Sequence, residues 1–201
     1  MNAPYNRSGA YISNDAGSAG TIRAFLAQFH VSTADAVAAD TDGIHAAIVD
    51  TGEEQTIATG ITNPAVPRNI TAAAGGTAGD IKAIQVIVAG TNAAGEAITE
   101  TLPAFTVDTA GSVIGSKAFA TVTSVTIPAH DGTGATTAIG FGSKLGLPYK
   151  LARNTVLAAF LDNTKEGTAP TVAVSASVLE SNTITLNSTL AGKAVDAYLI
   201  V

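Results

Sequence analysis

The stretch that most decides the fold is Ile81–Leu102, with the sequence IKAIQVIVAGTNAAGEAITETL. It predicts a strand over 81–88, a glycine-bounded turn over 90–95 and a return strand over 97–102. The side chains of a strand alternate between its two faces, so the first strand has one apolar row. That row consists of Ile84, Val86 and Val88, and Lys82 ends it. The pattern is typical of a β-hairpin with one buried face.

The same β pattern continues from residue 55 to the end of the chain. Short runs of Val, Ile and Thr are separated by Gly, Pro and Asn, which favour turns. Further strands are predicted at 55–61, 68–73, 119–127, 138–142, 154–161, 170–178, 182–186 and 194–201. Strands at this spacing favour a sandwich or a barrel. We therefore expect a mainly β protein, an antiparallel β-sandwich or barrel with an extended N-terminal arm and at most short helices.

The first quarter of the chain differs from the rest. Residues 1–20 are rich in Gly, Ser and Asn without a period, which predicts a flexible arm. Tyr5, Tyr11 and Ile12 on this arm are candidates for ordering against a partner. Residues 21–55 are predicted to connect the arm to a β-sandwich domain over 56–201. Within them, 21–29 has apolar residues at helical spacing but fits a strand equally well.

Composition and charge exclude several classes of function. Charged residues are only 13% of the chain, the net charge is −6 and Cys is absent. Nucleic-acid binding needs clustered Lys and Arg to contact phosphates, and none is present, so no direct nucleic-acid partner is expected. An acidic chain is also repelled by anionic membrane surfaces, and no apolar stretch is long enough to span a bilayer. Disulfides and cysteine-based metal sites are excluded.

The search for catalytic chemistry yields no motif. His30, His45 and His130 are far apart and lack metal-ligand neighbours at helical spacing. The pair His130–Asp131 precedes a glycine and is interpreted as a turn. Residues 40–43, DTDG, resemble the start of a calcium loop, but the bidentate Glu expected further along is missing, so they too are interpreted as a turn. We expect no enzyme activity, no metal and no cofactor.

Two charged residues within predicted strands are candidate partner-binding residues. Glu100 has apolar neighbours on its own face of the return strand, and Arg68 begins the strand at 68–73. An exposed position is expected for Glu100, since long charged side chains are seldom buried unpaired. The alternative is that Glu100 pairs across an interface with Lys82 or Arg68.

Residues 61–148 resemble a class of structural proteins from tailed-bacteriophage virions. The resemblance rests on four motifs: ITNPAVPRNI at 61–70, VAGTNAAGEAITE at 88–100, GSKAF at 115–119 and LGLP at 145–148. It implies a β-rich protein that assembles in many copies and transfers no catalytic residue. The implied function is a capsid decoration or cement protein, bound to the major capsid protein as a homo-oligomer, with a trimer expected. Its location would be the capsid surface, after assembly in the host cytoplasm.

Two other functions remain open from the sequence. A tail-tube or tail-associated protein of the same virion would form rings of six rather than follow the capsid lattice. A surface-layer or adhesin module would require export, and residues 1–20 lack the basic and apolar segments of a secretion signal.

Overall fold

The computed structural model describes residues 10–12 and 22–201. The described chain is mainly β, and every strand pair in it is antiparallel. Its helical segments are two short 3-10 turns, η1 (Ala78–Asp80) and η2 (Leu179–Ser181). The predicted fold class is therefore confirmed for the described residues. Most of the predicted arm lies outside them, except β1 (Ala10–Ile12), which pairs with β2 (Ile22–Ala24).

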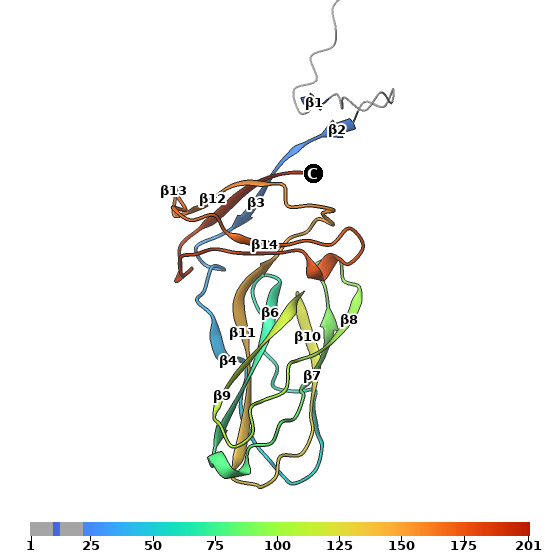
Figure 1. The fold of residues 1–201 in the computed structure, drawn as a ribbon, viewed down its shortest axis with the longest axis vertical. Coiled ribbons are helices and arrows are strands. Elements are labelled where there is room, and N and C mark those ends of the chain that lie inside the picture. Colours follow the sequence, from blue (N-terminus) through green and yellow to red (C-terminus); the bar gives the residue numbers. More distant parts are fainter. Residues whose placement is uncertain (1–9, 13–21) are drawn as a thin grey trace, which may run out of the picture.

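The narrow lower lobe in Figure 1 is a β-sandwich. One sheet has the order β5-β10-β7-β8, and the facing sheet has β11 between β4 and β6, with β9 beyond β6. The strands of the first sheet are β5 (Gln55–Ile57), β10 (Thr121–Ile127), β7 (Ile87–Thr91) and β8 (Ala97–Thr101). Those of the second are β4 (Asp40–Val49), β6 (Arg68–Gly76), β9 (Gly111–Phe119) and β11 (Ala135–Gly146). Both sheets contribute to one core, which includes Val88, Val125, Ile70 and Ile139.

The wider upper lobe has a second core of its own. Its four-stranded sheet, the upper sheet, has the order β13-β12-β16-β3. The strands are β13 (Thr164–Lys165), β12 (Val156–Leu161), β16 (Val195–Ile200) and β3 (Leu26–Val31). Two short strands, β14 (Thr171–Ala173) and β15 (Thr183–Thr185), continue the large lower sheet into this lobe, since β15 pairs with the end of β11. The region predicted as one sandwich, 56–201, thus contains two cores.

The predicted hairpin is confirmed, with β7 and β8 paired from Ile87↔Thr101 to Thr91↔Ala97. Its buried row is also confirmed, because Ile84, Val86 and Val88 are all core residues. The strand itself begins later than predicted: residues 81–86 lie outside β7, although Leu102 donates a backbone hydrogen bond to Val86 O.

The structure decides or corrects three local predictions. Of the two alternatives for residues 21–29, the described part forms strands: residues 22–24 are β2 and residues 26–29 begin β3, whose alternate residues face the core. Residues 40–43 begin strand β4 instead of forming a turn. The strand predicted at 119–127 is divided at Ala120, because β9 ends at Phe119 and β10 begins at Thr121. A register shift between Val122 and Ser124 lets Val122 and Val125, which are three positions apart, both reach the core.

Candidate functional site

Glu100 lies inside the protein, so the prediction of an exposed position is wrong. Only 8% of the residue is exposed. Its Oε1 accepts hydrogen bonds from Ser116 N at 2.7 Å and Ser116 Oγ at 2.8 Å, and Oε2 accepts one from Lys117 N at 3.2 Å. These donors belong to β9, whereas Glu100 belongs to β8, so the carboxylate joins the edges of the two sheets of the sandwich. Neither Lys82 nor Arg68 is its partner.

Arg68 is also inside, with 0% of the residue exposed. Its Nη1 donates to Val37 O at 2.7 Å, and the guanidinium lies over the Phe141 ring, 4.8 Å from the centroid. Nε and Nη2 have no hydrogen-bond partner. Burial therefore lowers the pKa of Arg68 to about 10, which leaves the group charged at neutral pH. The contact to Val37 ties the segment between β3 and β4 to the sandwich.

Three of the four motifs behind the resemblance, those at 61–70, 115–119 and 145–148, come together where the lobes join. Asn69 accepts from Lys144 N at 3.0 Å, and both Asn69 Nδ2 and Lys144 Nζ donate to Gly115 O. Gly146 packs so tightly that a Cβ there would come within 2.6 Å of the Ala118 Cβ. We call Arg68, Asn69, Gly115, Lys144 and Gly146 the junction. The junction residues make contacts between strands within the protein. These motifs therefore have a structural role in the fold, and none of the contacts indicates a catalytic role.

The remaining predicted partner-binding residues are on the N-terminal segment. Tyr5 lies outside the described residues. Tyr11 and Ile12 are in β1, where the backbone pairs Tyr11 with Arg23 and Ile12 with Ile22. In Figure 1 the described strand β1 lies apart from β6 and β8, the strands that carry Arg68 and Glu100.

His130 is part of a buried hydrogen-bond network at the far end of the lower lobe. Its Nδ1 accepts from Lys82 N at 3.1 Å, so the proton of the neutral ring is on Nε2, which lies 3.0 Å from Thr137 Oγ1. Burial lowers the pKa of His130, and the nearby carboxylates of Asp50 and Asp131 oppose this only in part. Every polar atom of the ring is thus used internally. The arrangement supports structure, as the predicted turn role implies, and does not present a base to a substrate.

No group of three or more His, Asp or Glu side chains that could hold a metal ion occurs among residues 10–12 and 22–201. Neither 3-10 turn in the described chain is long enough to cross a membrane. A groove of about 280 Å³ lies beside β12 and is lined in part by Leu157, Lys165 and Pro170. Its charged groups are Lys165 and Glu166, and the Glu166 carboxylate accepts a hydrogen bond from Ser188 N at 3.0 Å.

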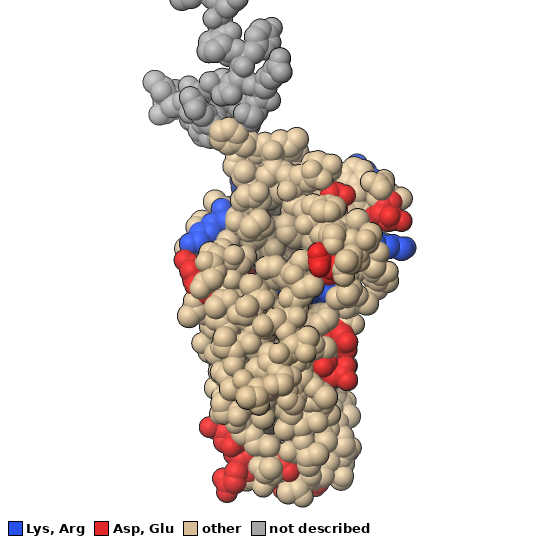
Figure 2. Space-filling model, turned by 180° about the vertical axis from the view of Figure 1, so that it is seen from behind, with Lys and Arg blue, Asp and Glu red and all other residues tan. Residues whose placement is uncertain are grey.

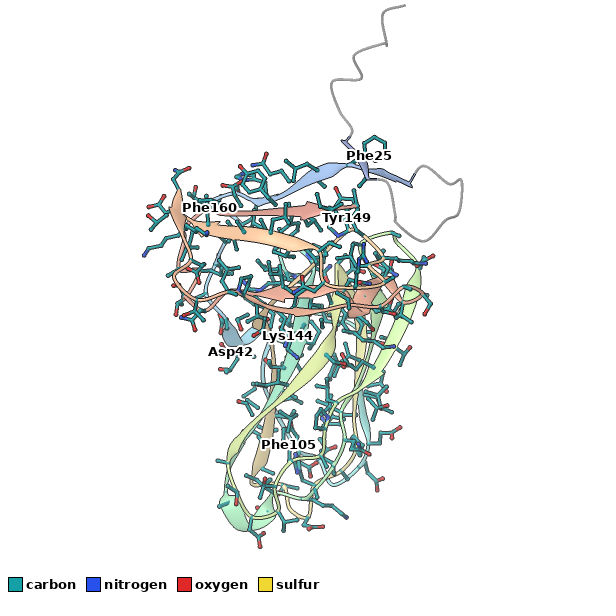
Figure 3. The ribbon with its side chains drawn as sticks, turned by 45° about the horizontal axis from the view of Figure 1, so that its top comes forward. Phe25, Asp42, Phe105, Lys144, Tyr149 and Phe160 are labelled. Atoms are coloured by element: carbon teal, nitrogen blue, oxygen red, sulfur yellow. The ribbon has the colours of Figure 1, made fainter. Side chains whose placement is uncertain are left out.

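The outer face of the upper sheet is the clearest candidate for contact with another protein. Large apolar side chains are exposed on or beside it: Leu26 63%, Leu157 63%, Phe25 40% and Val201 39%. Phe160 and Tyr198 form an edge-to-face pair there, with ring centroids 5.9 Å apart. Figure 3 shows Phe25 and Phe160 in this lobe, far from Phe105 in the lower lobe. We call this surface the outer face.

A polar cluster lies on the same face beside the apolar residues. Asp196 on β16 accepts from Gln28 Nε2 at 2.6 Å and contacts His30 Nδ1 at 2.8 Å. The hydrogen bond from His30 lowers the pKa of the Asp196 carboxyl, and that from Gln28 adds to the effect. Apolar side chains next to a small, internally satisfied polar cluster are typical of a protein interface.

The sequence prediction missed the outer face. Its signal was present: Leu157 and Phe160 in β12, and Leu26 in β3, occur in strands whose other residues fill the core. Several large apolar residues exposed on one sheet indicate a further contact, although a single one does not. Comparison with known proteins found no matching family model, no matching curated protein and no matching solved structure.

Proposed function

We propose that this chain is a structural protein of a tailed-bacteriophage virion that decorates the capsid shell. The observation that carries the proposal is the outer face, which exposes Leu26 and Leu157 at 63% each. These residues lie on the strands on either side of β16, and an exposed apolar patch on a folded protein indicates a protein-binding surface. The four motifs of residues 61–148 resemble those of phage structural proteins, so we propose a virion protein rather than another protein-binding protein.

The distribution of charge supports a protein partner. Charged residues are only 13% of the chain. Figure 2 shows that on one face they lie mostly at the margins and at the lower tip, which leaves a broad uncharged area between them. Burying such a surface against a protein shell has little desolvation cost, because few charges lose their water. The net charge of −6 favours the outside of a shell over a position against DNA.

The partners proposed are the major capsid protein and further copies of this chain. Each copy would bind a repeated site of the capsid lattice, and the resemblance implies a trimer. The N-terminal segment, residues 1–20, would reach a neighbouring subunit or the shell. A tail-tube protein would assemble in rings of six instead, so the symmetry of the assembled particle distinguishes the two functions.

The test is co-sedimentation of the purified chain with capsid shells that lack it. Leu157→Asp adds a charge to the outer face and should weaken binding. Losing the burial of one leucine is about 2 kcal/mol, or roughly thirtyfold in affinity. The matched control is Thr99→Asp, an exposed position on β8 in the lower lobe. Equal binding by the two variants would show that the outer face does not contact the shell.

Deleting residues 1–20 tests the arm separately. If the arm reaches the neighbour or the shell, the truncated chain should co-sediment less than the full chain. Unchanged co-sedimentation would remove the arm from the proposal and leave the outer face.

A further inference from the structure

The unpaired edge of strand β3 is a second surface through which copies of this chain could associate. β3 (Leu26–Val31) is the last strand of the upper sheet and pairs only with β16 in the described part of the chain. The pairing is regular over all six residues, from Val31↔Val195 to Leu26↔Ile200. A regular edge strand presents a row of unpaired backbone donors and acceptors.

The hydrogen-bond pattern shows which groups point outward. Phe25 and Val201 exchange two backbone hydrogen bonds of 2.9 Å each. Hydrogen-bonded pairs alternate along an antiparallel ladder, so Ala27, Phe29 and Val31 also bond toward β16. The N–H and C=O groups of the intervening residues therefore point away from the sheet. These residues are Leu26, Gln28 and His30.

The other edge strands of the three larger described sheets are short, irregular or joined to a neighbour, and β3 has none of these features. β5, β13 and β14 are only two or three residues long, and short edges seldom pair with other chains. β8 is joined to β9 through Glu100. β4 has two register shifts in its pairing with β11 and begins with Asp40 and Asp42. β3 contains no proline, no bulge and no Asp, Glu, Lys or Arg.

We propose that β3 pairs with β3 of a second copy about a twofold axis, which would join two upper sheets into one. Centring the axis on Gln28 places Gln28 opposite Gln28 of the second copy and Leu26 opposite His30. In this register each outward-pointing residue exchanges two backbone hydrogen bonds with its opposite number. No like charges face each other, because β3 has no Asp, Glu, Lys or Arg.

The inference rests on the self-association in the proposed function but does not depend on the trimer. A threefold axis cannot pair one strand with itself, so the β3 contact would be separate from a trimer contact. Two paired strands bury less than the roughly 1,000 Å² expected of a stable interface. We therefore expect weak pairing in dilute solution and stronger pairing where copies are held close together, as on a shell.

Single-cysteine cross-linking of the full chain tests the contact. The chain has no Cys, so each introduced thiol is unique. Directly opposed residues of a hydrogen-bonded antiparallel pair have Cα atoms about 5.5 Å apart, within the range of a disulfide. Under mild oxidation Gln28→Cys should form a covalent dimer. Leu157→Cys is the matched control, because it is exposed on the same lobe but two strands away. Equal cross-linking of both variants, or none at Gln28→Cys, would overturn the proposal.

A second variant measures the pairing without a covalent bond. Gln28→Pro removes an N–H that points outward, so the ladder with β16 keeps its hydrogen bonds. Sedimentation velocity should show a dimer that grows with concentration in the unmodified chain and is lost in Gln28→Pro. An unmodified chain that stays monomeric at all concentrations would also contradict the inference. If Gln28→Pro still binds shells, the proposed function stands whatever happens to the β3 contact.

Discussion

Replacing Glu100 by alanine should destabilise the protein more than any comparable change on the same strand. The carboxylate accepts hydrogen bonds from two backbone N–H groups, Ser116 N at 2.7 Å and Lys117 N at 3.2 Å. Alanine removes the acceptor of both groups. Ser116 is exposed and Lys117 is half-buried, so water replaces part of the lost interaction. A hydrogen bond to a charged group contributes about 1.5–3 kcal/mol, so Glu100→Ala should lower the free energy of unfolding by about 1–3 kcal/mol.

Urea unfolding followed by far-UV circular dichroism measures this loss, since Trp is absent. Glu100→Gln keeps one oxygen acceptor but turns an amide N–H₂ toward the other donor, so its loss should be intermediate. Thr101→Ala, one residue away and exposed, should change the free energy of unfolding by no more than about 0.5 kcal/mol. If Glu100→Ala were as stable as Thr101→Ala, the role assigned to Glu100 between β8 and β9 would be wrong.

Three further predictions concern the core and its pH dependence. Because burial lowers the pKa of His130 in the folded protein, the unfolded chain binds a proton at this histidine first as the pH falls. The contribution of His130 to stability should be complete above the ordinary histidine pKa of about 6.5 and decline below it. In urea titrations at a series of pH values, this decline should be smaller for His130→Gln. Gly90→Ala would drive a Cβ into the carbonyl oxygen of Thr121 and should cost about 1–3 kcal/mol, whereas Gly111→Ala, with nothing within 4 Å, should be nearly neutral in thermal unfolding. Arg68→Met fills much of the same space without a poorly satisfied buried charge, so it should be nearly as stable as the unmodified chain. Arg68→Ala leaves a cavity and should lower the free energy of unfolding by about 2–4 kcal/mol. Equal losses in the two variants would contradict this interpretation of the buried guanidinium.

The parts of the fold that follow from local pattern could be predicted from the sequence. The β7–β8 hairpin needs only two alternating runs and a glycine-bounded turn, and all three are continuous in the chain. Residues 21–29 were ambiguous because their apolar spacing fits both a helix and a strand, and pairing with β16, at the other end of the chain, decides for the strand. β9 was missed because Gly and Ser dominate its first half, and β6 supplies the pairing that makes it a strand.

The candidate site depended on long-range contacts that no local pattern contains. Glu100 was expected to be exposed because charged side chains are seldom buried unpaired. Its actual partners, Ser116 and Lys117, lie on another strand, so the local sequence does not show the pairing. The outer face combines residues from both ends of the chain, such as Leu26 and Leu157, and becomes a surface only when β16 lies between β3 and β12. Composition could indicate a protein partner but not the place where that partner binds.

Electron microscopy of virions assembled with and without this chain tests the central proposal most directly. If the chain decorates the capsid, its removal should abolish density at repeated lattice positions on the outer surface, with local three-folds the positions expected for a trimer. Capsids that are identical in the two preparations, or a difference confined to the tail, would contradict a decoration role.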